Sequence, residues 1–397
     1  MRVTQNLNQA QFISALNTLE ANLSQTQNQI STNLSFTTPS QNPVAAGAVT
    51  NYNQALLQSQ QYGTNANSAQ TQLSIEDTTL SQVQSALQSL RDLTLQANSG
   101  TVTPQGRAAI ATQATQIQAS LVSLANTQNG NGEYIFGGFV TQSPPFASSP
   151  TGATYSGDQG QRQVQIAAGQ SVAVGDNGAV VFNQIKTGNG TFTATAGAGN
   201  TGSGVLGAST VTNPAAYDGG TYAINITAPN TYEVRDSNNV LVTSGTYTDG
   251  QSIAFRGVQV TLNGQPAVGD TFSVAPSTNQ SVFTTVQNLV SALQTGGSGT
   301  ASQATLNNSL NTAINNIDQA LNQTSNVRSS IGGRLNSITT QQSVASSQQI
   351  QLQSSISSLQ SLDYASALTK LTEQNTTLSA AMQAYTLTQG LTLFKYL

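Results

Sequence analysis

Hydrophobic residues recur every three or four positions at both ends of this 397-residue chain, and every second position in parts of its middle. Near the N-terminus, apolar side chains from Val3 to Leu34 keep helical spacing, apart from one seven-residue step. Pro39 disfavours helical backbone at the residue before it. We therefore expect the first helix to end near Ser35.

A second, longer helix is predicted to begin at Pro43. Asn42 is a suitable N-cap, and proline is favoured at the first helical position. The apolar spacing then continues to about Asn98, through Leu73, Leu80, Val83, Leu87, Leu90 and Ala97. A helix of roughly 55 residues would extend about 80 Å. Thr103 and Pro104 repeat the start signal, and a third helix is expected to run to Gly130.

The C-terminal part carries a matching stripe. One heptad position is apolar over seven repeats, with Thr324 as its polar interruption: Leu310, Ile317, Ile331, Ile338, Ala345, Leu352 and Leu359. The stripe resumes after residue 362 and continues to Leu391. Charges at the flanking coiled-coil positions are almost absent, so the register must come from apolar fit and side-chain hydrogen bonds.

The middle of the chain predicts antiparallel β structure. Residues 162–174 alternate apolar and polar side chains, and several short strands follow after residue 219. Turns are expected at 236–239, 249–250 and 263–264. Residues 186–210 are low in complexity, and we expect a loop or a flexible hairpin there.

These patterns predict an α+β fold, in which both chain ends make a long antiparallel helical bundle or coiled-coil rod with an inserted antiparallel β domain. Three parts are expected. Residues 1–35 and 362–397 form a terminal helical domain. Residues 36–186 and 281–361 form a helical rod with β hairpins. Residues 187–280 form an exposed, β-rich domain.

The composition restricts the possible functions. Only 7% of residues are charged, the net charge is −4, and no basic patch is visible, which argues against nucleic acid as a partner. Cysteine and histidine are absent, which removes disulfides, thiolate metal sites and the commonest metal ligand. With so few titratable groups, we expect stability to change little between pH 3 and 7. No apolar run is long enough for membrane insertion, and the N-terminus has no signal-peptide pattern.

Motifs for catalysis are weak. Residues 197–202 and 202–207 both match G-x-G-x-x-G, but no helix is predicted after them, so a glycine-rich loop is the better interpretation. Glu76 and Asp77 are adjacent, and on a helix their side chains would point about 100° apart, which disfavours a catalytic pair. No P-loop or nucleophile motif is present. The sequence therefore predicts no enzyme, no cofactor and no metal site.

The amphipathic stripes are most simply explained as core, and we expect this for residues 43–128 and 281–360. Residues 1–35 and 362–397 would form only two helices with no further layer to cover them, so we expect them to pack against other chains. The predicted assembly interface is Val3, Leu7, Ile13, Leu16, Leu23, Ile30, Leu34, Leu368, Leu371, Leu378, Met382, Tyr385 and Leu391. The predicted joint and helix restart is Pro39, Asn42 and Pro43.

Several segments resemble the hook-associated protein three family of the bacterial flagellum. "TTPSQNPVAAGAV" resembles the segment after that family's first helix, and "LSIEDTTLSQVQSALQSLRDLTLQANSGT" its long helix. "LANTQNGNGEYIFGGFVTQSPPF" is similar to the exit into β structure. "SLDYASALTKLTEQNTTLSAAMQAYTLTQGLTLFKYL" resembles the C-terminal segment shared with flagellin. Flagellins have a DDAAG-type loop where this chain has Pro43, which favours the hook-associated family.

The resemblance implies an extracellular structural protein at the hook–filament junction, exported without a cleaved signal peptide. It implies a homo-oligomeric ring whose terminal helices form an inner tube. The implied partners are the neighbouring hook-side hook-associated protein, flagellin and a flagellar export chaperone. Flagellin itself, a non-flagellar surface fibre or adhesin, and a cytoplasmic coiled-coil scaffold remain as alternatives.

Overall fold

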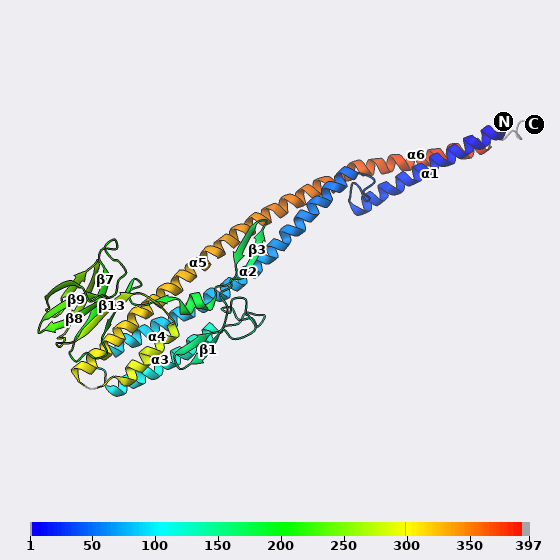
Figure 1. Ribbon diagram of the computed structural model, residues 1–397. Helices are drawn as coiled ribbons and strands as arrows, with labels where there is room; N and C mark the ends of the chain where they lie inside the picture. Colours follow the sequence, from blue (N-terminus) through cyan, green and yellow to red (C-terminus); the bar gives the residue numbers. More distant parts are fainter. Residues whose placement is uncertain (1, 298, 391–397) are drawn as a thin grey trace, which may run out of the picture. The chain divides into compact units, whose positions relative to one another are not determined.

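The chain divides into two compact units in the computed structural model, which describes residues 2–297 and 299–390. The terminal unit comprises the described residues up to Thr64 and from Gln341 onward. The body unit is Asn65–Thr340. Helices α2 (Pro43–Ala97) and α5 (Thr300–Gln360) contribute residues to both units (Figure 1). The predicted α+β class, with helical chain ends and an inserted antiparallel β domain, is confirmed.

In the terminal unit, α1 (Arg2–Thr32) and α6 (Tyr364–Gly390) lie side by side (Figure 1). Helix α1 ends three residues before the expected Ser35, because Asn33 adopts a left-handed conformation with φ of 56°. Beyond it, the Ser35 N–H donates to the Gln360 carbonyl at 2.7 Å, and the Leu362 N–H donates to the Asn33 carbonyl at 3.3 Å. Backbone hydrogen bonds therefore join the two segments where they leave the terminal helices.

The predicted restart of the second helix is confirmed. The Asn42 side chain accepts a hydrogen bond from the Ala45 N–H at 3.1 Å, and Pro43 is the first helical residue. Between the two helices, Phe36 turns inward and is 7% exposed. It packs in a small core with Ala45, Val49 and Ile356. The joint therefore has its own apolar anchor.

The helical core of the body unit contains α2, α3 (Pro104–Ala125), α4 (Val282–Thr295) and α5. Helix α3 starts as predicted, with the Thr103 side chain accepting from the Gly106 N–H, but it ends at Ala125 rather than Gly130. Helices α3 and α4 pack together. The stripe predicted on α2 is fully buried, as is the part of the α5 heptad stripe in this unit.

Thr324, the polar member of that stripe, is also buried. Its hydroxyl donates to the Ala320 carbonyl one turn earlier at 2.8 Å, so the buried oxygen has a partner. The interruption of the stripe is therefore satisfied within the helix.

Short β elements cover the helices. Two hairpins are formed by β1 (Phe146–Ser149) with β2 (Gly152–Tyr155), and by β3 (Gln163–Ala167) with β4 (Gln170–Ala173). A π-helical turn, η1 (Ala179–Asn183), leads to β5 (Ile185–Lys186), which pairs with β14 (Asn279–Gln280). Here Phe146, Phe182 and Phe283 meet, with ring centroids 5.2–5.8 Å apart. This aromatic cluster joins the hairpins to α4.

The inserted domain has two antiparallel sheets. The five-stranded sheet has the order β10-β9-β8-β13-β6 and contains β6 (Phe192–Ala196), β8 (Tyr222–Ala228), β9 (Thr231–Asp236), β10 (Leu241–Thr246) and β13 (Thr271–Pro276). The three-stranded sheet has the order β11-β12-β7 and contains β7 (Val205–Val211), β11 (Ser252–Phe255) and β12 (Val258–Asn263). Alternate residues of both sheets enter one core. The three predicted turns lie between strands, as expected.

The expectation of a loop or flexible hairpin at 186–210 is wrong. Strands β6 and β7 lie in this segment, but they do not pair with each other. Strand β6 pairs with β13, and β7 pairs with β12. Phe192 and Leu206 anchor them in the core. The partners come much later in the chain, so local composition carries no sign of them.

Asparagine side chains of α5 hold the β domain against the body helices. Asn308 accepts from the Leu206 N–H at 2.8 Å and donates to the Gly204 carbonyl at 3.0 Å. Asn316 accepts from the Gly188 N–H at 2.8 Å. Each amide offers both a donor and an acceptor without a charge that would have to be desolvated. Neutral asparagine side chains therefore hold the β domain to α5 by hydrogen bonds, where an ion pair could have served instead.

The Asn308→Ala variant is expected to be about 2–3 kcal/mol less stable, because it leaves a buried N–H and a carbonyl without partners. Urea unfolding of the full chain measures this. Ser309→Ala, one residue further on the same helix, is the control. Ser309 is half-buried and its hydroxyl donates to the Thr305 carbonyl of its own helix, so its replacement leaves no group of the β domain without a partner and should change stability by less than about 0.5 kcal/mol. Equal stability of the two variants would refute the role of Asn308.

Candidate functional site

Helices α1 and α6 share a seam that includes part of the predicted assembly interface. Half-buried side chains follow each other at spacings of three and four along both helices: Phe12, Leu16, Leu19 and Leu23 on α1, and Leu371, Gln374, Leu378, Ala381 and Tyr385 on α6. The rings of Phe12 and Tyr385 stack, with centroids 5.2 Å apart. The Gln9 amide donates to the Tyr385 hydroxyl at 3.3 Å. Five predicted interface residues, Leu16, Leu23, Leu371, Leu378 and Tyr385, thus belong to the stripes of this pair.

Other predicted interface residues face solvent. Leu7 is 59% exposed, Ile13 43%, Leu368 48% and Met382 53%. We call these four the outward residues. They lie on the same two helices, and each is more exposed than the seam residues.

The remaining predicted interface residues divide further. Ile30 and Leu34 are half-buried near the joint. Leu391 and the side chain of Val3 lie outside the described residues. Of the joint residues, Pro39, Asn42 and Pro43 are all exposed.

Exposed apolar side chains are concentrated in the terminal unit. Seventeen large hydrophobic side chains are exposed in the described part of the chain. Eleven of them belong to this smaller unit: Leu7, Ile13, Val44, Tyr52, Leu57, Val344, Ile350, Tyr364, Leu368, Met382 and Leu387. A concentration of exposed apolar surface marks a site of association.

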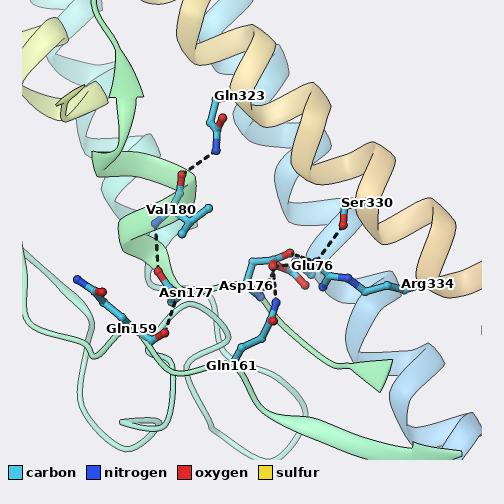
Figure 2. Close-up of polar contacts among 9 residues, drawn as sticks. All are labelled: Glu76, Gln159, Gln161, Asp176, Asn177, Val180, Gln323, Ser330 and Arg334. Atoms are coloured by element: carbon cyan, nitrogen blue, oxygen red, sulfur yellow. Dashed lines mark hydrogen bonds and ion pairs between the residues drawn. The ribbon is translucent and has the colours of Figure 1, made fainter. Parts of the chain in front are cut away.

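A second candidate site is a buried polar cluster in the body unit (Figure 2). Glu76 of α2 is 1% exposed, and its Oε1 accepts the backbone N–H of Asp176 at 2.9 Å. The Asp176 carboxylate accepts from Arg334 of α5 at 2.8 and 3.0 Å, and from the Gln161 amide at 2.8 Å. Three segments far apart in sequence therefore meet in one hydrogen-bonded cluster.

Burial raises the pKa of Glu76 to about 8, and the negative charge of Asp176 adds to this. The Asp176 N–H and the Arg334 guanidinium act in the opposite direction and lower the pKa of Glu76, but they do not offset the burial. Glu76 is therefore an acid in its neutral form over most of the physiological pH range.

Glu76 and Asp77 point to different partners, as their spacing predicts. Asp77 pairs with Arg328 of α5, with Nε and Oδ1 2.9 Å apart. The sequence did not identify Asp176 as the partner of Glu76, because the two lie 100 residues apart. It also did not identify Arg334 as the partner of Asp176, which lies 158 residues before it. A glutamate inside an apolar helical stripe was the only local signal.

Residues 197–204 of the glycine-rich stretch form a capped turn between β6 and β7. The Asp270 carboxylate accepts the N–H groups of Thr201 and Gly202 at 2.8 and 3.1 Å. Strand β7 follows it, where a dinucleotide site requires a helix. Within residues 2–297 and 299–390, no three acidic side chains gather as metal ligands do. In the same residues, no helix combines the length and apolar character needed to cross a bilayer.

The ends of the chain match two regions of bacterial flagellin. Residues 3–141 match the bacterial flagellin N-terminal helical region, and residues 314–397 match its C-terminal helical region. Residues 195–276 match the D2-like domain of flagellar hook-associated protein 1. The inserted β domain is thus similar to a domain of another hook-associated protein.

Whole-protein comparisons agree with these matches. The chain is 33% identical over 187 residues to flagellar hook-associated protein 3 of Salmonella typhimurium, an alignment that covers 47% of this chain. It spans 58% of the Salmonella protein, somewhat more than half.

Two solved structures extend the likeness. The crystal structure of Xanthomonas campestris FlgL has 36% sequence identity and a TM-score of 0.73, covering 77% of this chain and 99% of that one. The flagellar junction protein FlgL from Legionella pneumophila has 26% identity and a TM-score of 0.73, covering 79% and 100%. With paired terminal helices, an inserted β domain and this agreement in sequence, the chain belongs to the flagellar hook-associated protein 3 family.

Proposed function

We propose that this chain is a structural component of the bacterial flagellum that joins hook and filament, and that it assembles through the outward residues of α1 and α6. The observation that carries the proposal is the concentration of exposed apolar side chains in the terminal unit. The family supports it, since a relative from Legionella is named as a flagellar junction protein.

Burial of the exposed apolar side chains would contribute favourable free energy to association. Full burial of a fully exposed large apolar side chain contributes about 1.5–3 kcal/mol. The four outward residues are about half exposed, so covering them could contribute about 3–6 kcal/mol per chain before the entropy of assembly is subtracted. The seam residues are already half-buried within the chain and would contribute less. Assembly therefore depends on a smaller set of residues than the terminal stripes suggest.

The proposed assembly is a ring of identical chains between the neighbouring hook-side hook-associated protein and flagellin. Hook-associated relatives favour this position over that of a filament subunit. We further propose export through the flagellum without a cleaved signal peptide, with the help of an export chaperone. A chain without cysteine is compatible with unfolding for export, because no disulfide has to be reduced.

The proposed role is architectural, without catalysis. Among the described residues, the buried acid, Glu76, is enclosed by α2, α5 and the segment around Asp176. A general acid must reach a substrate, and Glu76 is 1% exposed. Its position is that of a structural group.

Deletion of residues 1–35 or 362–397 is expected to abolish motility and leave cells without attached filaments, because each deletion removes one partner of the α1–α6 pair. Electron microscopy of cells and a swimming assay measure this. Filament monomers released into the medium should increase. Cells that keep attached filaments would refute the junction role.

The same cells separate this role from that of flagellin. A junction protein is expected to be a trace component of sheared filaments, measured by quantitative mass spectrometry against the major subunit. If this chain were the major subunit, the flagellin alternative would hold instead.

A further inference from the structure

The buried polar cluster contains two carboxyl groups and one guanidinium. Arg334 directs its Nη2 to both oxygens of Asp176, at 2.8 and 3.0 Å. It makes no ion pair with Glu76 among the described residues. The guanidinium therefore pairs directly with Asp176, and its charge acts on Glu76 only at longer range.

Glu76 has no cation of its own. Its Oε1 accepts one backbone N–H, and its Oε2 is buried without a hydrogen-bond partner. A buried carboxylate needs several donors or a counter-charge to offset the loss of hydration. A neutral carboxylic acid needs far less.

The charged groups that face Glu76 are few. From the segment after β4 comes Asp176, and from α5 comes Arg334. The β3–β4 hairpin, residues 163–173, carries no charged residue. On α2 itself, Asp77 is turned toward Arg328. The Asp176 N–H and Arg334 stabilise an ionised Glu76 only in part, and they do not offset its burial.

We infer that Glu76 is a proton-binding site on which folding of the body unit depends: the unit folds with this carboxyl protonated, and ionisation of Glu76 weakens the contact between α2, the Asp176 segment and α5. Folding at neutral pH therefore takes up a proton from solvent. This device is independent of how the terminal helices assemble.

The direction of the pH dependence follows from the pKa. Burial raises the pKa of Glu76 to about 8, above the ordinary value of 4.5 that it regains on unfolding. Because the folded state binds the proton more tightly, the stabilisation is complete below about pH 4.5 and is lost as pH rises toward 8. An acidic exterior would therefore favour folding, and an alkaline one would oppose it.

The first test compares thermal unfolding of the full chain with that of Glu76→Gln between pH 5 and 9. Glutamine keeps the acceptor for the Asp176 N–H and cannot ionise. The unaltered protein is expected to lose several degrees of Tm across this range relative to Glu76→Gln. Asp77→Asn is the matched control, because it removes the adjacent carboxyl of α2 from a partly exposed pair, and it should keep the pH dependence of the unaltered protein. Parallel curves for the unaltered protein and Glu76→Gln would overturn the inference.

The second test needs no comparison of stabilities. Refolding at pH 7 in weak buffer with a pH indicator should take up about one proton more in the unaltered protein than in Glu76→Gln. The infrared band of a protonated carboxylic acid should be present in the folded protein at pH 7 and absent in Glu76→Gln. If the variant fails to fold, the infrared band and its disappearance above pH 8 in the unaltered protein decide the matter. A spectrum at pH 7 without that band would overturn the inference.

Discussion

Replacing Leu368 and Met382 together with glutamine is expected to abolish filament attachment without unfolding the monomer. Both side chains belong to α6 and are about half exposed. They are more exposed than the seam residues, so their removal costs the isolated chain less than a change in the seam. In an assembly their exposed halves would be covered, and the lost burial of the two side chains amounts to about 1.5–3 kcal/mol per chain. Attached filaments are counted by electron microscopy, and the fold of the purified protein is checked by circular dichroism.

Two further variants make this result specific. Thr372→Gln with Ser379→Gln changes two exposed polar positions of the same helix and should leave filaments attached. Leu371→Gln with Leu378→Gln changes the seam, and should reduce the helix content of the purified protein. Normal attachment in the Leu368 and Met382 variant would show that the outward residues are not the assembly surface.

The Phe283→Ala variant is expected to destabilise the body unit by about 3–5 kcal/mol. Phe283 is fully buried at the start of α4, and its ring lies 5.2 Å from that of Phe146 and 5.8 Å from that of Phe182. Its loss opens a cavity where the hairpins meet the helices. Aromatic contacts add to the cost of lost burial. Urea unfolding followed by near-ultraviolet circular dichroism measures the change.

Phe139→Ala is the matched control for this variant. Phe139 is 64% exposed in the loop between α3 and β1, so the same chemical change should cost less than about 1 kcal/mol. If both phenylalanine variants had the same stability, the aromatic cluster would not be a main support of the body unit.

The joint between α1 and α2 shows how far local signals reach. The start of α2 at Pro43 was predicted because the Asn42 side chain and the fixed φ of proline act on neighbouring residues. Pro39 predicted the end of α1 near Ser35, and the helix ends three residues earlier, at Thr32. The burial of Phe36 was not predicted, because its partners include Ile356 of α5, which is distant in the sequence.

The expectation that stability changes little with pH stays a prediction, and Glu76 bears directly on it. Counting titratable groups treats each carboxyl as solvated. Only the three-dimensional contacts show that Glu76 is enclosed by segments 100 and more residues away. The pH series proposed for Glu76→Gln tests both statements.

Hydrophobic periodicity does not determine which residues of the terminal stripes are buried in the seam and which stay exposed. Spacing places Leu368 and Leu371, or Leu378 and Met382, on one broad apolar face. The structure assigns Leu371 and Leu378 to the seam with α1 and leaves Leu368 and Met382 exposed. The position of α1 makes that distinction, and no pattern within α6 contains it.

The order of the elements, the helix starts and the alternating strands follow from the sequence, because they depend on periods, caps and turns that act over a few residues. The pairing of β6 and β7 with β13 and β12, the asparagine contacts of α5 and the proton on Glu76 do not. Each of these depends on hydrogen-bond partners or burial supplied by distant segments. Such contacts exist only once the chain has folded, which is why the tertiary structure alone decides them.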